Sequence, residues 1–360
     1  MTQEAAQERI TSVQGLRFLA AFAVLIGHVE IFAYHLGRFR GVELWRPPLI
    51  ASTAFGVDLF FAISGFIMIF SSQRLFGMPG ARRTFMARRL RRIVPLYWLA
   101  LGFTVIWGWR FGPAADLRSV ASAFAFIPHP SPIAHGRIVP PLEVGWTLNY
   151  EMLFYVLFAL CLGISARTTA LRLGTLLAVG VVLGAVLSLP QPLAYWTDPV
   201  VLEFAGGIGI ALLYRKGAAL PATLRLGMVL LAAVLVLMPS AATMGAGGQH
   251  AAGQNAAGQG GWFRLLTWGV AGWLVLSATV LGPLRLRAAG TWRVGGDLSY
   301  ALYLVHMPLL MVAQFLWRHY RLPYGPAQAL LFAIGMTVLS LIVAAAVHFL
   351  VEKPLLSRRE

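Results

Sequence analysis

Ten apolar stretches of about 20 residues constrain this sequence more than any other feature. The hydrocarbon core of a bilayer is about 30 Å thick, and a helix that rises 1.5 Å per residue needs roughly 20 apolar residues to cross it. Most of the stretches are too long to be sheet strands. The sequence therefore predicts an all-α polytopic membrane protein with about ten transmembrane helices. The predicted spans are 14–34, 52–71, 91–109, 143–164, 172–190, 197–214, 224–240, 262–283, 296–317 and 327–350.

The composition agrees with a chain that faces lipid. Hydrophobic residues make up 58% of the 360 residues and charged residues only 12%, whereas a soluble domain carries about 25% charged residues. The single cysteine, Cys161, excludes an internal disulfide. No Cys/His cluster has the spacing of a zinc site, so we expect no metal.

The positive charge is distributed unevenly between the loops. With the N-terminus taken as cytoplasmic, 19 Lys and Arg residues fall in inner segments and 9 in outer segments. Cytoplasmic loops are enriched in Lys and Arg, so we expect both termini in the cytoplasm. This bias accounts for much of the net charge of +16 without a nucleic-acid partner. Residues 241–261 are predicted to form a flexible outer loop, and residues 1–360 a single transmembrane domain.

Arg17 and His28 lie on one face of the first predicted span. Eleven residues are close to three helical turns, which separates the two side chains by about 16 Å along the axis. Ionisable groups inside a span are costly and usually face a cavity or a partner. The pair offers a phosphate anchor and a titratable base at different depths. The alternative is a snorkelling arginine and a structural histidine.

Three further ionisable residues reach the interior of predicted spans. Asp58 enters the second span at a depth close to that of His28, so its carboxylate is expected to orient the imidazole. The alternative for Asp58 is a helix cap. Glu151 and His306 reach the middle of the membrane, and both have aromatic neighbours in the sequence.

An arginine cluster, Arg88-Arg89-Leu90-Arg91-Arg92, stands at the inner end of the third predicted span. One guanidinium group can donate two parallel hydrogen bonds to two oxygens of a phosphate group. The cluster therefore indicates a site for a phosphorylated ligand. The alternative is a topology signal that also contacts anionic lipids.

Six motifs, in order along nearly the whole chain, resemble those of membrane-bound acyltransferase family 3, the bacterial O-acyltransferases that modify sugars. The third matches the family's Arg-x-x-Arg element, and its register selects Arg89 and Arg92. The fourth has the form seen in exopolysaccharide acetyltransferases of the ExoZ type. The motifs are SVQGLRFLAAFAVLIGHV (12–29), GVDLFFAISGFIM (56–68), RRLRRIVPLYWL (88–99), WTLNYEMLFYVLFAL (146–160), LSYALYLVHMPLL (298–310) and VEKPLLSRR (351–359).

The resemblance implies transfer of an acyl group, usually acetyl, from cytoplasmic acyl-CoA to a sugar hydroxyl. Acetyl-CoA is then a substrate, and no permanently bound cofactor is expected. Arg17, Arg89 and Arg92 are expected to bind the acyl-CoA. His28 is expected to act as general base, oriented by Asp58, or to carry the acyl group itself.

The expected acceptor is an exopolysaccharide or other cell-surface glycan, or its lipid-linked precursor. Four residues are expected to shape the acceptor pocket or to stabilise the oxyanion: Trp146, Glu151, Tyr303 and His306. The alternatives are an acyltransferase for a small glycosylated metabolite and a proton-coupled transporter or flippase. We expect a multi-pass protein of the bacterial cytoplasmic (inner) membrane, with membrane lipids and polysaccharide-assembly proteins as further partners.

Overall fold

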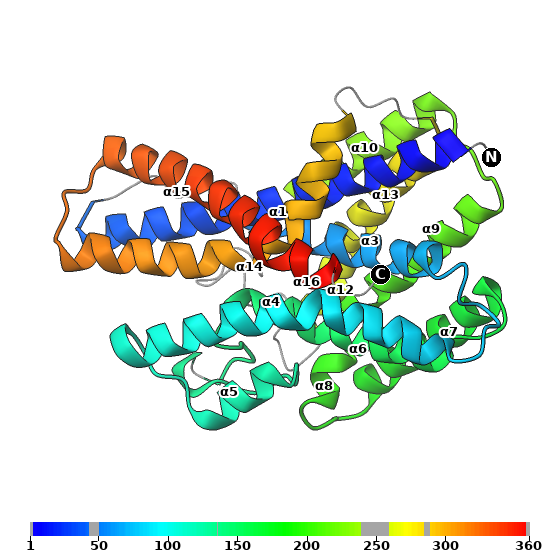
Figure 1. Ribbon diagram of the computed structural model, residues 1–360, viewed down its shortest axis with the longest axis horizontal. Coiled ribbons are helices and arrows are strands. Elements are labelled where there is room, and N and C mark those ends of the chain that lie inside the picture. The colour runs from blue at the N-terminus through cyan, green and yellow to red at the C-terminus, as the bar shows by residue number, and fades with distance from the viewer. Residues whose placement is uncertain (1–2, 43–49, 135, 239–258, 284–288, 358–360) are drawn as a thin grey trace.

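The computed structural model describes residues 3–42, 50–134, 136–238, 259–283 and 289–357. Within these ranges the chain is helical and contains no β-strand (Figure 1). The all-α class is therefore confirmed. The predicted outer loop at 241–261 lies almost wholly outside the described residues.

Each predicted span coincides with a helix in the described part of the chain, and the span 262–283 is made by α12 and α13 together. The longer helices are α1 (Gln3–Phe39), α3 (Phe55–Ser71), α4 (Ala81–Phe111), α6 (Trp146–Cys161), α7 (Ala166–Val186), α9 (Leu202–Arg215), α10 (Ala222–Leu237), α13 (Val270–Val280), α14 (Ala289–His319) and α15 (Pro326–Val347). The shorter ones are α2 (Ile50–Thr53), α5 (Leu117–Phe124), α8 (Leu193–Trp196), α12 (Gln259–Arg264) and α16 (Lys353–Ser357).

Seven helical segments of the described ranges are long and apolar enough to cross a bilayer. They are Thr11–Phe39, Ala81–Phe111, Glu143–Cys161, Ala166–Val186, Gly261–Val280, Ala289–His319 and Pro326–Leu356. Helices α3 and α10 are apolar but shorter, with 17 and 16 residues, and α9 has 14. The protein is therefore a multi-pass membrane protein, while the predicted count of ten spans goes beyond the seven that length and composition support.

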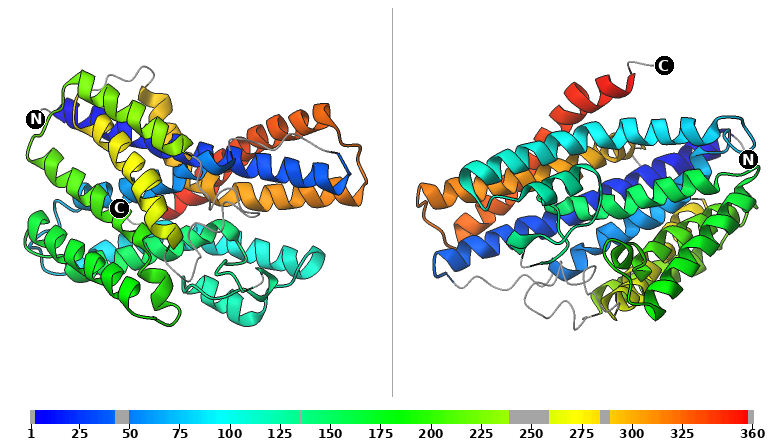
Figure 2. Two further views of the ribbon diagram at one scale, coloured as in Figure 1. Left: turned by 180° about the vertical axis from the view of Figure 1, so that it is seen from behind. Right: turned by 90° about the horizontal axis from the view of Figure 1, so that it is seen from below.

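The helices pack around α3, and one group consists of α9, α10 and α13 (Figure 1). In a second group α1 and α14 lie side by side with α15, and α4, α6 and α7 form a third (Figures 1 and 2). Helix α3 packs against α9 at two glycines. A Cβ atom on Gly65 would lie 2.1 Å from the carbonyl oxygen of Phe204, and one on Gly207 would lie 2.0 Å from that of Ala62. Only glycine permits this backbone approach, which fixes α3 in the middle of the bundle.

Candidate functional site

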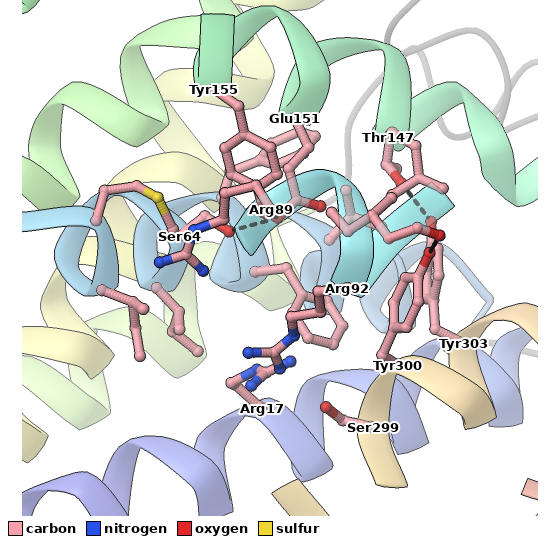
Figure 3. Close-up of a pocket in the computed structure, with 18 residues that line it drawn as sticks. Arg17, Ser64, Arg89, Arg92, Thr147, Glu151, Tyr155, Ser299, Tyr300 and Tyr303 are labelled. Atoms are coloured by element: carbon pink, nitrogen blue, oxygen red, sulfur yellow. Dashed lines mark hydrogen bonds between the residues drawn. The ribbon is translucent and has the colours of Figure 1, made fainter. Parts of the chain in front are cut away.

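A pocket between α1, α3, α4, α6 and α14 collects several of the predicted site residues (Figure 3). We call it the arginine pocket. Its polar lining residues are Arg17, Ser64, Arg89, Arg92, Thr147, Glu151, Tyr155, Ser299, Tyr300 and Tyr303. Helices that are far apart in the sequence therefore bring the three arginines predicted to bind acyl-CoA, Arg17, Arg89 and Arg92, to one cavity.

The arginines enter this pocket from two helices. Figure 3 shows the guanidinium groups of Arg17 and Arg92 turned toward one another. Arg89 donates to Ser71 Oγ over 2.8 Å, and its guanidinium lies 5.8 Å from the centre of the Tyr155 ring. Arg17 donates to Gln14 Oε1 over 3.2 Å. These contacts hold the guanidinium groups in place without neutralising their charge.

Arg88 and Arg91, the other pair with the same spacing, are exposed and do not line the arginine pocket. Each residue of a helix is turned by about 100° from the one before it, so the pair 88 and 91 is turned by about 100° from the pair 89 and 92. The chain thus holds two arginine pairs on one helix, only one of which reaches the cavity.

Glu151 lies in the arginine pocket as well. Its Oε1 accepts hydrogen bonds from Ser64 Oγ, over 3.0 Å, and from the Tyr155 hydroxyl. One carboxylate among three guanidinium groups leaves the pocket with an excess of positive charge. The pocket therefore suits a ligand with several negative charges.

His28 and His306 lie against one another, with 3.3 Å between His28 Nδ1 and His306 Nε2. His306 Nδ1 lies 2.8 Å from the carbonyl oxygen of Leu302, which only accepts, so this nitrogen carries the proton and Nε2 is an acceptor. His28 Nδ1 lies 2.9 Å from the carbonyl oxygen of Val24 and donates to it and toward His306. The lone pair of the neutral His28 ring is therefore on Nε2, the nitrogen that a general base uses.

His28 lines a second pocket, the histidine pocket, together with Trp146 and Arg264. Val57 and Tyr303 line both pockets. The arginine pocket and the histidine pocket therefore lie on either side of these two residues, inside the bundle.

The hydroxyl group of Tyr303 is held at this boundary. It lies 2.7 Å from Thr147 Oγ1 and 2.9 Å from the carbonyl oxygen of Val144. Of the four predicted acceptor residues, Trp146 lines the histidine pocket, Glu151 the arginine pocket and Tyr303 both, whereas His306 contacts His28 and lines neither.

Asp58 has a different partner from the predicted one. Arg264 donates from Nε to Oδ1 over 2.7 Å and from Nη2 to Oδ2 over 2.8 Å, and the two side chains are 2% and 0% exposed. Helix α3 begins at Phe55 without a side-chain cap, so Asp58 is not a helix cap either. The structure places His306, in place of the predicted carboxylate of Asp58, beside the imidazole of His28.

Arg264 is the functional-site residue that the sequence does not reveal. It stands at the outer end of a predicted span, where the charge count treats it as a loop residue. Its guanidinium lies 5.3 Å from the ring centres of both Trp146 and Trp268, and a π-helical turn, Leu265–Gly269, follows it. The only sequence signal for Arg264 was Asp58 in another span. A carboxylate inside the membrane needs a positive partner, but the sequence does not say which one.

Among the described residues, no group of three or more His, Cys, Asp and Glu side chains is placed to hold a metal ion. The chemistry that the two cavities offer is anion binding in one and proton transfer in the other.

Comparison of the sequence with known proteins gives a family profile and several relatives. The profile of the acyltransferase domain family, Acyl_transf_3, matches residues 10–349. The exopolysaccharide production protein ExoZ of Rhizobium meliloti (strain 1021) is 34% identical over 85% of this chain and 90% of its own. The acyltransferase MdmB of Streptomyces mycarofaciens is 28% identical over 98% of this chain and 93% of its own.

A third relative is similar over a smaller region. The peptidoglycan O-acetyltransferase OatA of Listeria monocytogenes is 28% identical over 44% of this chain and 25% of its own. No solved structure matches the chain. The family profile covers nearly the whole sequence, and this confirms that the chain belongs to acyltransferase family 3.

Proposed function

We propose that this protein is an O-acyltransferase that moves an acetyl or other short acyl group from cytoplasmic acyl-CoA to a hydroxyl of an exopolysaccharide glycan or its lipid-linked precursor. We place it in the bacterial cytoplasmic membrane with both termini in the cytoplasm. The observation that carries the proposal is the pair of adjoining cavities: three arginines line one, and His28 lines the other. The similarity to an exopolysaccharide production protein supports this acceptor class.

The arginine pocket is the donor site in this proposal. Coenzyme A carries several phosphate negative charges at one end of a long, flexible arm and the thioester at the other end. Arg17, Arg89 and Arg92 bind the phosphate end, and the arm extends past Tyr303 toward the histidine pocket. Arg17 and His28 are eleven residues apart on α1, so the arm has about 16 Å to cover along the helix axis.

The histidine pocket is the reaction site. His28 Nε2 accepts the proton of the acceptor hydroxyl while that oxygen attacks the thioester carbonyl carbon. The new C–O ester bond forms, the C–S bond breaks, and the proton passes from His28 to the departing coenzyme A thiolate. His306 and the carbonyl oxygen of Val24 accept from Nδ1–H throughout, and so stabilise the imidazolium that forms.

The general-base role is tested with purified protein in lipid nanodiscs. His28→Gln is expected to lower acetyl transfer by at least about 100-fold, since a positioned general base contributes roughly that much, while acetyl-CoA still binds. His129→Gln, in a loop away from both pockets, is the matched control and keeps its activity. Full activity in His28→Gln would contradict the mechanism. An acetylated His28 peptide, trapped by rapid quenching and found by mass spectrometry, would assign the acyl-enzyme route instead.

The donor site is tested by comparing two double variants on one helix. Arg89→Gln/Arg92→Gln is expected to raise the acetyl-CoA KM by about tenfold or more, the effect of losing charge-assisted phosphate contacts. Arg88→Gln/Arg91→Gln removes the same charge from the exposed pair and should leave the donor KM unchanged. Equal effects in both variants would assign the cluster to membrane topology. If no coenzyme A is released by the wild-type protein with any acceptor, a transporter becomes the better explanation.

A further inference from the structure

A third pocket lies beyond the histidine pair, between α1, α4 and α14. We call it the aromatic pocket. The lining residues that matter here are Phe32, Trp107, Phe111, Gln314, Phe315 and Arg318. Nothing in the proposed reaction yet uses it.

On α1 and α14 the aromatic pocket follows the arginine pocket and the histidine pair in the same order. On α1 the order is Arg17, His28 and Phe32; the last two are four residues apart, or about 6 Å along the axis. On α14 it is Ser299 in the arginine pocket, His306, and then Gln314. Helix α4 likewise runs from the arginine pocket to the aromatic pocket, and the ends of these helices gather at one end of the molecule (Figure 1). The histidine pair therefore stands between the arginine pocket and the aromatic pocket.

Three aromatic rings form one wall of this pocket. The ring centre of Trp107 lies 5.5 Å from that of Phe315 and 4.6 Å from that of Phe111, and those of Phe111 and Phe315 are 5.0 Å apart. The planes of Trp107 and Phe315 are 89° apart and those of Trp107 and Phe111 are 44° apart, so mutual contact holds the rings in place as an apolar wall of tilted faces. The face of a pyranose ring presents polarised C–H bonds, which pack favourably on the electron-rich face of an aromatic ring.

Two hydrogen-bond donors of the lining residues have no partner. Gln314 Nε2 and Arg318 Nε are both buried and unbonded among the described residues. Leaving such a donor unsatisfied is unfavourable, so a ligand that offers oxygen atoms gains from this site. An acyl chain of a lipid has no oxygen to offer along its length, whereas a sugar presents hydroxyls beside its apolar face.

We propose that the aromatic pocket binds a sugar ring of the acceptor, adjacent to the sugar whose hydroxyl reaches His28. This assignment rests on the proposed function and names the acceptor side of it. Donor and acceptor then approach the histidine pair from opposite ends of the same three helices.

The test uses wild-type protein in nanodiscs, acetyl-CoA, and oligosaccharides from the host's own exopolysaccharide after alkaline removal of its esters. Trp107→Leu and Gln314→Leu are each expected to raise the oligosaccharide KM about tenfold, the effect of one lost stacking or hydrogen-bonding contact. The acetyl-CoA KM and the slow hydrolysis of acetyl-CoA in the absence of acceptor should not change. Trp98→Leu is the matched control, because Trp98 is exposed on the same helix and bonds to Phe124, outside the pocket.

Each result decides between named alternatives. Transfer with an unchanged oligosaccharide KM in both pocket variants overturns the sugar site and leaves the proposed function standing. Absence of transfer by the wild-type protein overturns the proposed acceptor class itself. Inhibition by added polyprenyl phosphate that Trp107→Leu relieves, with an unchanged oligosaccharide KM, would assign the pocket to a lipid and overturn the sugar site.

Discussion

The ion pair between Asp58 and Arg264 allows a quantitative prediction. Both side chains are buried, and two hydrogen bonds of 2.7 and 2.8 Å join them. A hydrogen bond to a charged group contributes about 1.5–3 kcal/mol net, so two such bonds correspond to about 3–6 kcal/mol. Removing one partner of a buried pair costs about 3–5 kcal/mol, because the other charge is left in a low-dielectric interior. We therefore expect Arg264→Met to lower the free energy of unfolding by about 3–5 kcal/mol.

The double variant separates pairing from packing. Asp58→Leu/Arg264→Met leaves no unpaired charge, and replacing a buried pair by apolar side chains is often close to neutral. Its free energy of unfolding should therefore lie well above that of Arg264→Met alone. The coupling energy in the cycle should be at least about 2 kcal/mol. Reversible unfolding in mixed micelles, with increasing SDS, measures all four proteins. A double variant that loses the sum of the two single losses would refute a coupling between the two side chains.

Two further features sharpen this test. Glu203 is fully buried beside Asp58, so its carboxyl group is available to Arg264 when Asp58 is replaced. Asp58→Leu should therefore be less destabilising than Arg264→Met, and Glu203→Gln should remove that difference. Acetyl transfer should stay low in the double variant although stability recovers, because Arg264 lines the histidine pocket and lies over Trp146.

Three other substitutions have defined outcomes. His306→Ala should lower kcat about 100-fold at an unchanged donor KM. His306→Gln should retain more activity, because its side-chain oxygen can accept from Nδ1–H of His28. Steady-state kinetics compare the two variants. Gly207→Ala places a methyl group against the carbonyl oxygen of Ala62 and should cost about 1–3 kcal/mol of stability. Gly209→Ala, on the same helix with nothing within 4 Å, is its control in a thermal unfolding assay. Tyr303→Phe keeps the ring but removes a hydroxyl with two buried partners, so kcat should fall while the protein still folds; unchanged kcat would contradict a role for this hydroxyl.

The sequence predicts the helices well because backbone polar groups in a bilayer must bond within their own segment, which leaves the helix as the natural outcome for a long apolar stretch. It predicts their ends less well. Helix α4 begins at Ala81, ten residues before its apolar stretch, and carries the arginine cluster as additional helical turns. Hydropathy marks where lipid begins, and a helix can continue beyond that boundary.

Residues of one helix were easier to predict than partners on different helices. Periodicity places Arg17 and His28 on one face of α1, and the structure puts each in a pocket. The partner of Asp58 comes from 206 positions later in the chain. Its position depends on how α12 packs against α3, which no local pattern encodes. Arg264 at the edge of a span has the same sequence signature as an ordinary topology charge.

The boundary formed by Val57 and Tyr303 has an electrical consequence. If cavities that open toward the two membrane faces were joined by water, ions would leak through the protein and dissipate the membrane potential. Moving one elementary charge across the membrane takes about 2.3 kcal/mol per 100 mV, so the several charges of coenzyme A are expensive to carry across. The acyl group has no charge and passes this boundary without electrical work. In the proposed reaction the acyl group therefore passes the boundary, while the phosphate groups of the carrier stay on the side of the arginine pocket.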